Sequence, residues 1–289
     1  MTNIADQRRL YAEQLQALVG FHSTELFDAF ATVPREHFLG PGPWHIPVRG
    51  PQGQMDYRTT DNTDPACLYQ NVLVAIDRSR GLNNGEPSSW AAWIDALDIR
   101  MGERIVHAGS GTGYYSAILA ECVGSTGHVI SVEVDPALAQ RARTNLAYLR
   151  HVEVVTGNGG ELRLPPSDVI IINAGVTHPP APWLDALNDS GRMLLPVTGA
   201  KNRDVIGFGG MFVITRLSTQ YSAACVSPVG IFPCVGLRDP DYSAQLLEKT
   251  ESDWQAVRSL RRDVHEPDST CWLHTSDGCL STQGLTKAA

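Results

Sequence analysis

Short apolar runs alternate with amphipathic segments through the middle of the chain. The runs have the length of strands, and the segments between them repeat their apolar residues at the three-four spacing of a helix. Strands that alternate with helices form right-handed βαβ units, so we predict an α/β fold with a mostly parallel sheet. The expected strands are 105–108, 128–134, 152–156, 168–173 and 193–196, and the expected helices are 114–122, one starting at Asp135, and 182–188.

The first hundred residues have a different pattern. Amphipathic spacing predicts helices at 4–19, 23–31 and 88–97, and a strand-like stretch covers 68–76. Residues 40–65 are rich in Gly, Pro and Asp, which is typical of a long loop, and 77–87 form a second polar loop. We expect these loops to act as lids or binding segments.

The last eighty residues are expected to leave the parallel pattern. Runs at 211–217 and 223–232 predict an antiparallel hairpin on the sheet edge. After Gly236 we expect a separate extension, with a helix over 241–262 and a hairpin over 270–282 that turns at Ser276-Asp277-Gly278. The predicted organisation is 1–84 for N-terminal helices and substrate loops, 85–235 for the core, and 236–289 for the extension.

Composition and charge narrow the class of protein. The chain has 289 residues, is 43% hydrophobic and carries a net charge of −8, which disfavours nucleic acid as a partner. The chain has neither a signal-like start nor an apolar run near the roughly 18 residues that span a bilayer, so we expect no membrane partner. Six cysteines without a disulfide-like rhythm indicate a reducing, cytoplasmic setting. The pattern leaves a monomer and a homodimer equally open.

A loose group of metal-ligand residues lies near the C-terminus. Cys271, His274 and Cys279 are close in sequence, but a fourth ligand at zinc spacing is missing. We therefore expect no metal and predict that these side chains pack inside a hairpin.

The residues with the clearest chemical signal form a glycine loop. A strand-like run ends at His107, glycines follow at Gly109, Gly111 and Gly113, and a helix starts at Tyr114. Glycines spaced by two let the backbone turn and approach a ligand, and the helix points its N-terminal amides at the same place. Glu133, 20 residues after Gly113, ends the next apolar run. A carboxylate there can bind the ribose of a nucleoside cofactor.

The spacing of the loop discriminates between nucleosides. Dinucleotide sites use G-x-G-x-x-G, whereas this loop has G-x-G-x-G followed by bulky tyrosines. A phosphate loop of the ATPase type needs a Lys-Ser/Thr pair, which is absent. S-adenosylmethionine remains, because it has no phosphates. A glycine-rich turn that binds nothing is the alternative.

At this point the sequence resembles the protein-L-isoaspartate (D-aspartate) O-methyltransferase family. Six blocks match it in order and approximate spacing, over roughly residues 10–233: Val33-Pro-Arg-Glu-His-Phe38, Tyr69-x-Asn71 with Leu73 and Ile76, Gly109-Ser-Gly-Thr-Gly-Tyr114, Val132-Glu133, Gly157-Asn-Gly159 and Gly191-Arg-Met-Leu-Leu-Pro196. The resemblance implies a class I S-adenosylmethionine methyltransferase Rossmann-like fold and a carboxylate acceptor on a peptide or protein.

The resemblance also implies roles for particular residues. The loop Gly109, Ser110, Gly111, Thr112, Gly113 would wrap the methionine part, Glu133 the ribose, and Asn158 with Gly159 the adenine edge. The family normally has an aspartate where Asn158 stands, but an amide oxygen can still accept from the adenine amino group. Neighbouring candidates for cofactor contact are His107, Val134 and Asn173. For His107, a packed core histidine is the simpler interpretation.

The sequence departs from the family on the acceptor side. Family members carry Gly-Gln-Thr-Ile-Ser-x-Pro, and its serine, which lies at the reaction centre, falls on Gly85 here. We therefore place the acceptor site at Asn83, Asn84 and Gly85, although turn chemistry explains the asparagines as well. Tyr57, Arg58 and Tyr69 are candidates for substrate binding. Arg58 could pair with a substrate carboxylate, although a solvated loop residue is the simpler interpretation of Tyr57 and Arg58.

These departures resemble a divergent branch of the family that acts in actinobacterial pathways for ribosomally made peptides, including lanthipeptides. That resemblance implies methylation of an aspartyl side chain or C-terminus of a precursor peptide, which can lead through a succinimide to isoaspartate. Two alternatives remain open: a methyltransferase that repairs isoaspartate in damaged proteins, and a non-catalytic binding module that keeps the fold.

Overall fold

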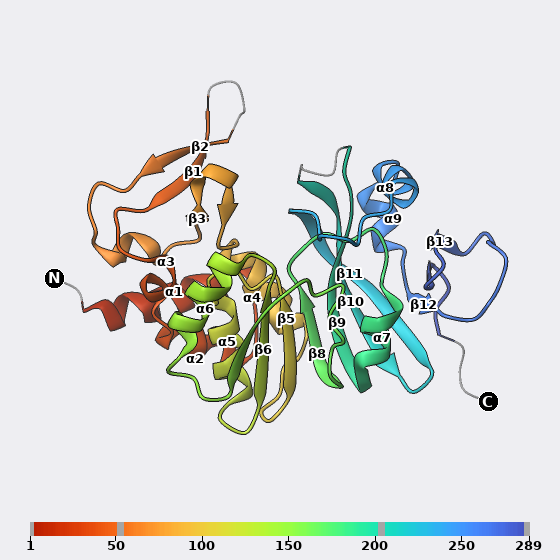
Figure 1. Ribbon diagram of the computed structural model, residues 1–289, viewed down its shortest axis with the longest axis horizontal. Coiled ribbons are helices and arrows are strands. Elements are labelled where there is room, and N and C mark those ends of the chain that lie inside the picture. The colour runs from red at the N-terminus through yellow and green to blue at the C-terminus, as the bar shows by residue number, and fades with distance from the viewer. Residues whose placement is uncertain (1–2, 51–54, 202–205, 286–289) are drawn as a thin grey trace. The chain divides into compact units, whose positions relative to one another are not determined.

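The computed structural model describes residues 3–50, 55–201 and 206–285. The chain forms two compact units (Figure 1). Residues 1–102 and 110–156 make up the first, and residues 103–109 and 157–289 make up the second. Helices and strands alternate along the chain as the α/β prediction requires.

The first unit contains a helical N-terminal part and one parallel strand pair. Its β6 and β7 pair in parallel, with Val129 opposite Val152. The elements are α1 (Ile4–Val19), α2 (Thr24–Thr32), α3 (Arg35–Leu39), β1 (His45–Arg49), β2 (Met55–Thr59), η1 (Pro65–Leu68), β3 (Ala75–Asp77), η2 (Arg78–Arg80), β4 (Leu82–Asn83), α4 (Pro87–Ala96), α5 (Tyr114–Val123), β6 (His128–Glu133), α6 (Pro136–Leu146) and β7 (Val152–Thr156).

Local sequence explains where the helices of this unit begin. The Ser23 hydroxyl accepts a hydrogen bond from the Leu26 N–H at the start of α2. Asp135 does the same for two amides of α6, with Pro136 in the first helical position. Buried side chains of α1, α2 and α4 pack together, among them Tyr11, Phe30 and Trp90. The helices predicted from apolar spacing are confirmed in this unit.

Two predictions for the first unit were wrong. Residues 40–65 do not form one long loop, because β1 and β2 pair as an antiparallel ribbon with His45 opposite Thr59. Residues 68–76 do not form a strand; only their end enters β3, which pairs with β4. The carbonyl groups of the segment before β3 bond to an arginine side chain instead of a neighbouring strand.

That arginine is Arg35, whose side chain is fully buried. Its Nη1 donates to the carbonyl oxygens of Leu68 (2.6 Å) and Gln70 (3.2 Å). Its Nη2 donates to the Val72 carbonyl oxygen (2.6 Å) and to Asn84 Oδ1 (3.3 Å). A planar guanidinium with five N–H donors can satisfy several acceptors at once. Arg35 therefore replaces a sheet ladder as the scaffold of residues 68–84.

The second unit is built on one mixed sheet. Its strands follow the order β13-β14-β12-β11-β10-β9-β8-β5, with β5, β8 and β9 parallel and the remaining pairs antiparallel. The elements are β5 (Arg104–Ala108), β8 (Ser167–Ile172), α7 (Ala181–Ala186), β9 (Leu187–Gly199), β10 (Gly207–Leu217), β11 (Gln220–Ile231), α8 (Pro240–Leu247), α9 (Glu251–Gln255), β12 (Ser259–Arg261), β13 (Cys271–His274) and β14 (Cys279–Ser281).

Apolar runs correctly located the strands of this sheet except β12, which lies where a helix was predicted. The four residues 169–172 of β8 are at most 1% exposed, as expected for a strand covered on both faces. The predicted hairpin is confirmed as β10 and β11, with both strands longer than expected. Its expected place at the sheet edge was wrong, because β12 pairs with the other side of β11. The C-terminal hairpin is confirmed as β13 and β14, and through β12 it extends the same sheet.

The helix predicted over 241–262 was wrong. The segment contains α8, α9 and the short strand β12. A capping box explains the break: the Thr250 side chain accepts from the Asp253 backbone N–H, and the Asp253 carboxylate accepts from the Thr250 backbone N–H. Such a box starts a new helix and ends the previous one. Over the described part of the chain, none of the helices is long and apolar enough to cross a membrane.

We predict that replacing Arg35 unfolds the acceptor side of the first unit. Arg35→Met keeps an apolar stem but leaves buried oxygen acceptors without donors, which should cost on the order of 3 kcal/mol or more of unfolding free energy. Arg9→Met is the matched control, because the Arg9 side chain is 69% exposed and pairs only with Glu13 among the described acidic residues. Its cost should stay below about 0.5 kcal/mol. Urea unfolding of both variants measures the difference, and equal losses would contradict the scaffold role.

Candidate functional site

In the first unit, the glycine loop follows a backbone path that only glycine tolerates well. Gly111 and Gly113 have φ values of +58° and +93°. A Cβ on Gly113 would lie 2.7 Å from Leu146 Cδ1 of α6. The loop is closed by hydrogen bonds from the Ser110 N–H to the Val132 oxygen (3.2 Å) and from the Gly113 N–H to the Ser110 oxygen (3.0 Å). The spacing of the glycines thus fits a tight approach of α5 to α6.

Glu133 is joined to this loop by its carboxylate. Oε2 accepts the Gly111 N–H at 2.7 Å and Oε1 accepts the Asp135 N–H at 3.0 Å. The residue is only 6% exposed, and burial raises its pKa, while the backbone N–H groups oppose that shift. Each carboxylate oxygen has a second lone pair, so both can still accept a hydroxyl group. Ribose binding is therefore compatible with the position of Glu133.

Two neighbouring features fit an adenosyl ligand. The Ser110 hydroxyl is buried and has no hydrogen-bond partner among the described residues, although buried polar atoms are normally paired. Val134, directly after Glu133, is 46% exposed. A partnerless hydroxyl and an exposed apolar side chain on either side of a carboxylate suit a ligand that is partly polar and partly aromatic. Thr112 is buried and its carbonyl oxygen accepts from Asn145 Nδ2 (2.9 Å).

In the second unit, Gly109 and Asn173 meet where β5 and β8 end. The Gly109 oxygen accepts from Asn173 Nδ2 (3.0 Å), and a Cβ on Gly109 would lie 2.9 Å from the Asn173 oxygen. This is the carboxyl edge of parallel strands, where α/β folds bind ligands. His107 is buried on β5, and burial lowers its pKa to about 3. A neutral, packed histidine agrees with the simpler interpretation of this residue.

Asn158 and Gly159 shape a loop of the same unit. Asn158 Oδ1 accepts the Gly160 N–H (3.0 Å), and its Nδ2 donates to Glu161 Oε1 (3.0 Å) and to the Val235 oxygen (3.2 Å). The Gly159 oxygen accepts from Trp183 Nε1 (3.0 Å). Both ends of the Asn158 amide already serve the loop, so its contact with adenine stays a prediction.

On the acceptor loop, the two asparagines differ. Asn83 Nδ2 donates to the Gly81 oxygen (3.0 Å) and its Oδ1 accepts from the Tyr57 hydroxyl (3.2 Å), as turn chemistry predicts. Asn84 Oδ1 accepts the Val74 N–H (3.1 Å) as well as the Arg35 bond. The Asn84 Nδ2 is buried without a partner in the described ranges. Asn84 thus keeps a donor for which the structure offers no protein acceptor.

Gly85 stands where no side chain fits. Its φ is +85°, and an added Cβ would lie 2.5 Å from Trp90 Nε1 and 3.1 Å from Tyr115 Cε2. The Gly85 oxygen accepts from the Tyr115 hydroxyl (3.1 Å), and the Trp90 and Tyr115 rings stack with centroids 4.1 Å apart. The stacked rings of Trp90 and Tyr115 therefore leave no room for a side chain at Gly85, and the match of this position to the family serine stays a prediction.

Cationic side chains join the acceptor loop to α6. Arg141 Nη1 donates to the Ile76 oxygen (2.9 Å). Arg80 bridges the carboxylates of Asp77 and Asp135, and Asp135 is the residue that caps α6. These contacts lie within the first unit, as Glu133 and Asn84 do. Neither arginine was singled out from the sequence, because nothing in a single arginine marks it as an anchor.

The predicted substrate-binding residues are spread over different surroundings. The buried Tyr69 hydroxyl accepts from Arg8 Nε (2.8 Å) and the Arg35 N–H (3.2 Å) and donates to Glu36, so it supports the N-terminal helices. Tyr57 reaches the acceptor loop through Asn83. Arg58 is exposed on β2. Direct contact of the three with a substrate stays a prediction.

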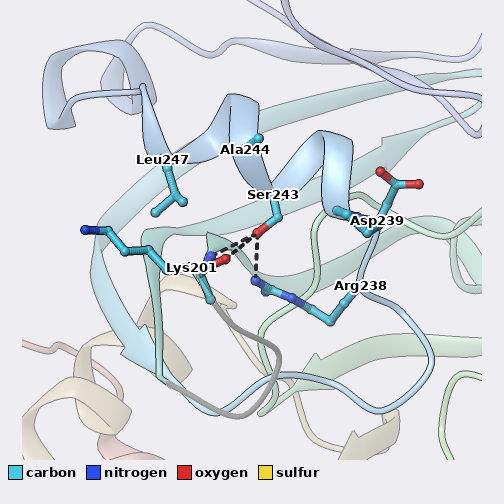
Figure 2. Close-up of a pocket in the computed structure, with 8 residues that line it drawn as sticks. Lys201, Arg238, Asp239, Ser243, Ala244 and Leu247 are labelled. Carbon is cyan, nitrogen blue, oxygen red and sulfur yellow. Dashed lines mark hydrogen bonds between the residues drawn. The ribbon is translucent and has the colours of Figure 1, made fainter.

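A pocket elsewhere in the second unit has a different character. Figure 2 shows it between α8 and the end of β9. Ser243 Oγ accepts the Ala200 N–H and donates to the Ala200 oxygen, both at 3.0 Å. Arg238 Nη1 donates to Thr198 Oγ1 (2.8 Å). These polar groups pair with one another, so they hold α8 on the sheet and do not point to a ligand.

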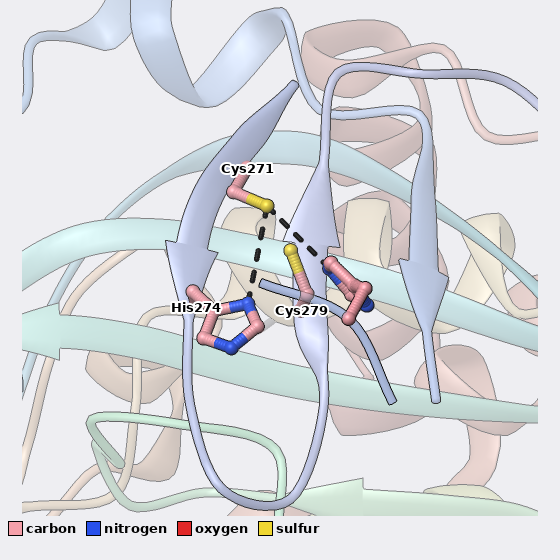
Figure 3. Close-up of side chains that lie close together, drawn as sticks. Cys271, His274 and Cys279 are labelled. Atoms are coloured by element: carbon pink, nitrogen blue, oxygen red, sulfur yellow. Dashed lines mark hydrogen bonds between the residues drawn. The ribbon is translucent and has the colours of Figure 1, made fainter. Parts of the chain in front are cut away.

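The fourth metal ligand that the sequence analysis did not find is His265. The structure brings it to Cys271, His274 and Cys279, and the four ligand atoms lie within 4.8 Å of one another. Figure 3 shows the side chains of the two cysteines and His274 facing one another across β13 and β14. The expectation of a missing ligand was therefore wrong.

Comparison with known proteins agrees with the cofactor geometry. Residues 62–209 match the family model described as protein-L-isoaspartate(D-aspartate) O-methyltransferase. A protein-L-isoaspartate O-methyltransferase of Methanothrix thermoacetophila is 37% identical over 196 residues, which cover 66% of this chain and 82% of the relative. Protein-L-isoaspartate O-methyltransferase 1 of Archaeoglobus fulgidus is 32% identical over 196 residues, or 66% and 80%.

Solved structures show the same fold. A protein-L-isoaspartate O-methyltransferase superposes with a TM-score of 0.58 at 20% identity, covering 88% of this chain and 71% of the other. A putative one from Plasmodium falciparum, in complex with S-adenosyl-L-homocysteine, has a TM-score of 0.59 at 15% identity, covering 78% and 97%. At such identities the likeness shows the fold, which is that of class I methyltransferases.

We predict that Glu133 contributes to cofactor affinity through the ribose. Glu133→Gln loses the charge and one acceptor, so the Kd for S-adenosylhomocysteine should rise about 10- to 100-fold. Glu153→Gln, an exposed change on β7, should leave the Kd unchanged. Titration calorimetry measures both.

A 2′-deoxy analogue of S-adenosylhomocysteine separates ribose contact from damage to the loop. The wild-type protein should bind the analogue more weakly than S-adenosylhomocysteine. The Glu133→Gln variant should bind the two compounds with nearly the same affinity. If the variant prefers S-adenosylhomocysteine to the analogue as strongly as the wild-type protein does, another group binds the ribose.

Proposed function

Because the chain belongs to the protein-L-isoaspartate(D-aspartate) O-methyltransferase family, it is an S-adenosylmethionine-dependent carboxyl O-methyltransferase, and we propose that its acceptor is an isoaspartyl carboxylate in a peptide or protein. The relatives above are named for that acceptor. The precursor-peptide substrate suggested by the sequence gains no support from them, and it is retained only as a second candidate.

Methyl transfer to a carboxylate asks little of acid–base groups. A carboxyl group with an ordinary pKa near 4 is almost fully ionised at pH 7. S-adenosylmethionine supplies the electrophilic methyl group on its sulfonium sulfur. The protein then has to hold the acceptor oxygen in line with that methyl group and to exclude water around it. No general base is needed, which agrees with a buried, neutral His107.

The proposal rests on two groups of the first unit: a carboxylate that the glycine loop holds, Glu133, and a buried amide donor without a partner among the described residues, Asn84 Nδ2. The Glu133 carboxylate is positioned by the glycine loop, and the Asn84 amide is positioned by Arg35 and Val74. Arg80 and Arg141 connect the acceptor loop to the helix that follows Glu133. In our proposal Glu133 orients the ribose, and the partnerless Asn84 Nδ2 donates to the acceptor carboxylate.

One observation favours the second candidate, an aspartyl carboxylate in a precursor peptide. Trp90 and Tyr115, both buried, leave no room for a Cβ at Gly85, the position that the sequence analysis matches to the family serine. A site without that hydroxyl would select its acceptor by shape more than by hydrogen bonding. This change concerns the choice of carboxylate and leaves the cofactor side intact.

A pair of synthetic peptides distinguishes the two candidates. The peptides share one sequence and differ only in an isoaspartyl or an aspartyl residue at the same position. With labelled S-adenosylmethionine, we expect base-labile methyl incorporation into the isoaspartyl peptide and at least about 10-fold less into the aspartyl peptide, a difference of about 1.4 kcal/mol. The reverse preference would support the second candidate, and incorporation into neither would contradict the proposed acceptor.

We predict that Asn84 acts on turnover and not on cofactor binding. Asn84→Asp keeps Oδ1 as an acceptor for Val74 and Arg35 but replaces the Nδ2 donor with a negative oxygen. The kcat/KM for the acceptor should fall on the order of 100-fold, because a donor becomes a repelling charge. Asn83→Asp is the matched control and should fall less than about 3-fold, since Nδ2 of Asn83 serves the turn. Calorimetry should show unchanged cofactor affinity for both, and an equal fall in both variants would contradict the assignment.

A further inference from the structure

The strongest unassigned feature is a group of four potential metal ligands in the second unit. We call His265, Cys271, His274 and Cys279 the C-terminal cluster. Cys271 Sγ lies 3.5 Å from His265 Nε2 and 3.9 Å from His274 Nδ1, and all four ligand atoms lie within 4.8 Å of one another. Tetrahedral zinc with ordinary bond lengths spaces its ligands about 3.3–3.8 Å apart. No two ligand atoms therefore need to approach each other by more than about 1.5 Å.

A β-bulge places three of these side chains on one face. Cys271 and His274 are three residues apart on β13, so in a regular strand they would point to opposite faces. The register shifts between Cys271 and Leu273, so that Cys271 is opposite Ser281 while His274 is opposite Cys279. Residues 279 and 281 share a face of β14, and the bulge thus brings Cys271 and His274 to that face together.

His265 is oriented as metal-binding histidines are. Its Nδ1 lies 2.8 Å from the Asp263 carbonyl oxygen and 3.1 Å from the Asp263 carboxylate. A proton on Nδ1 satisfies those acceptors and leaves Nε2 with a lone pair directed at Cys271. A ligating histidine characteristically donates its other N–H to a carbonyl or carboxylate. The His265 side chain is 12% exposed, which shields this arrangement from water.

Outer contacts hold the cluster in place. The Asp268 N–H donates to Cys271 Sγ (3.3 Å), a contact that stabilises a thiolate. Arg261 binds the carboxylates of Asp263 (3.1 Å) and Asp268 (2.9 Å). One arginine thus fixes the partner of His265 and the partner of Cys271. On β12 it lies opposite Cys279, so its charge also faces the cluster.

We propose that the C-terminal cluster binds one zinc ion in a closed structural site. Two thiolates and two imidazoles are a Cys₂His₂ donor set, which suits Zn²⁺ and leaves no position open for a substrate. Binding releases the two thiol protons to solvent, and no redox step is involved. This site is separate from the proposed acceptor residues, which lie in the first unit.

The zinc ion would stabilise the end of the sheet. β12 pairs with β11 through only two residues, Leu260 and Ser259. β13 and β14 are four and three residues long, and short strands contribute few ladder bonds. A metal would join these strands to the preceding segment, which carries His265. It would thereby add stability that such short strands lack.

Metal analysis of the full chain tests the proposal. The protein is expressed in medium supplemented with zinc, purified without chelators and measured by plasma mass spectrometry. We expect about one zinc per chain. Replacement of zinc by Co²⁺ should give the visible absorption of a tetrahedral site and a thiolate charge-transfer band. This spectrum is measured on the wild-type protein and does not depend on a variant that folds.

Variants locate the ion. Cys279→Ser and His265→Gln should each reduce the zinc content at least about 5-fold, and a chelator should lower the melting temperature of the wild-type protein. Cys225→Ser is the matched control, because Cys225 is a half-buried cysteine of the same unit whose Sγ donates to the Ser227 oxygen (3.5 Å) much as Cys279 donates to Leu280 (3.6 Å). It should keep its zinc.

Three results would overturn the proposal. The first is a zinc-free protein with all cysteines titratable as thiols after unfolding. The second is a Cys271–Cys279 disulfide, detected as a loss of two hydrogen masses. The third is iron with inorganic sulfide in place of zinc. None of these results depends on methylation activity. The zinc proposal and the proposed acceptor can therefore be refuted independently of each other.

Discussion

The segment 68–84, where we propose that the acceptor binds, depends on one buried guanidinium. Arg35 gathers three backbone oxygens of residues 68–72 and the Asn84 side chain, and it is 0% exposed. These groups would otherwise need a neighbouring strand or water, because buried backbone acceptors are costly when unpaired. A charge in such a place is tolerated because both Nη atoms donate hydrogen bonds to oxygens and the guanidinium lies over the Tyr114 ring. Arg35, a residue of α3, therefore fixes the backbone path of residues 68–84.

The packing around Gly85 explains why this position has no side chain. At Gly85 the loop takes a left-handed conformation and approaches Trp90 so closely that a Cβ has no room. Restoring the serine alone would displace Trp90 from its stack on Tyr115. Glycine, tryptophan and tyrosine at these positions form one packed unit. A side chain at position 85 would therefore require these two rings to move.

The sequence allowed most of the fold to be predicted, because apolar spacing and capping residues act locally. Asp135 with Pro136 started α6 as expected, and the run before Asn173 gave a doubly covered strand. The errors came from interactions between distant residues. The bonds from Arg35 prevented a strand at 68–76, and no local signal announces them. The C-terminal cluster was missed because His265 stands outside any regular spacing and because a bulge, which the sequence does not display, re-aims Cys271.

The cofactor side shows how a buried carboxylate can be stable before a ligand arrives. Burial alone disfavours the charged form of Glu133 and raises its pKa, but the N–H groups of Gly111 and Asp135 bond to its two oxygens and oppose that effect. The same bonds orient the remaining lone pairs, so two ribose hydroxyls would meet acceptors that are already fixed. Binding then costs little conformational entropy of the loop and the Glu133 side chain, and a lower entropic cost favours affinity. Because Gly111 belongs to the loop itself, the order of the loop and the proposed affinity for the ribose would be linked through the Glu133 side chain.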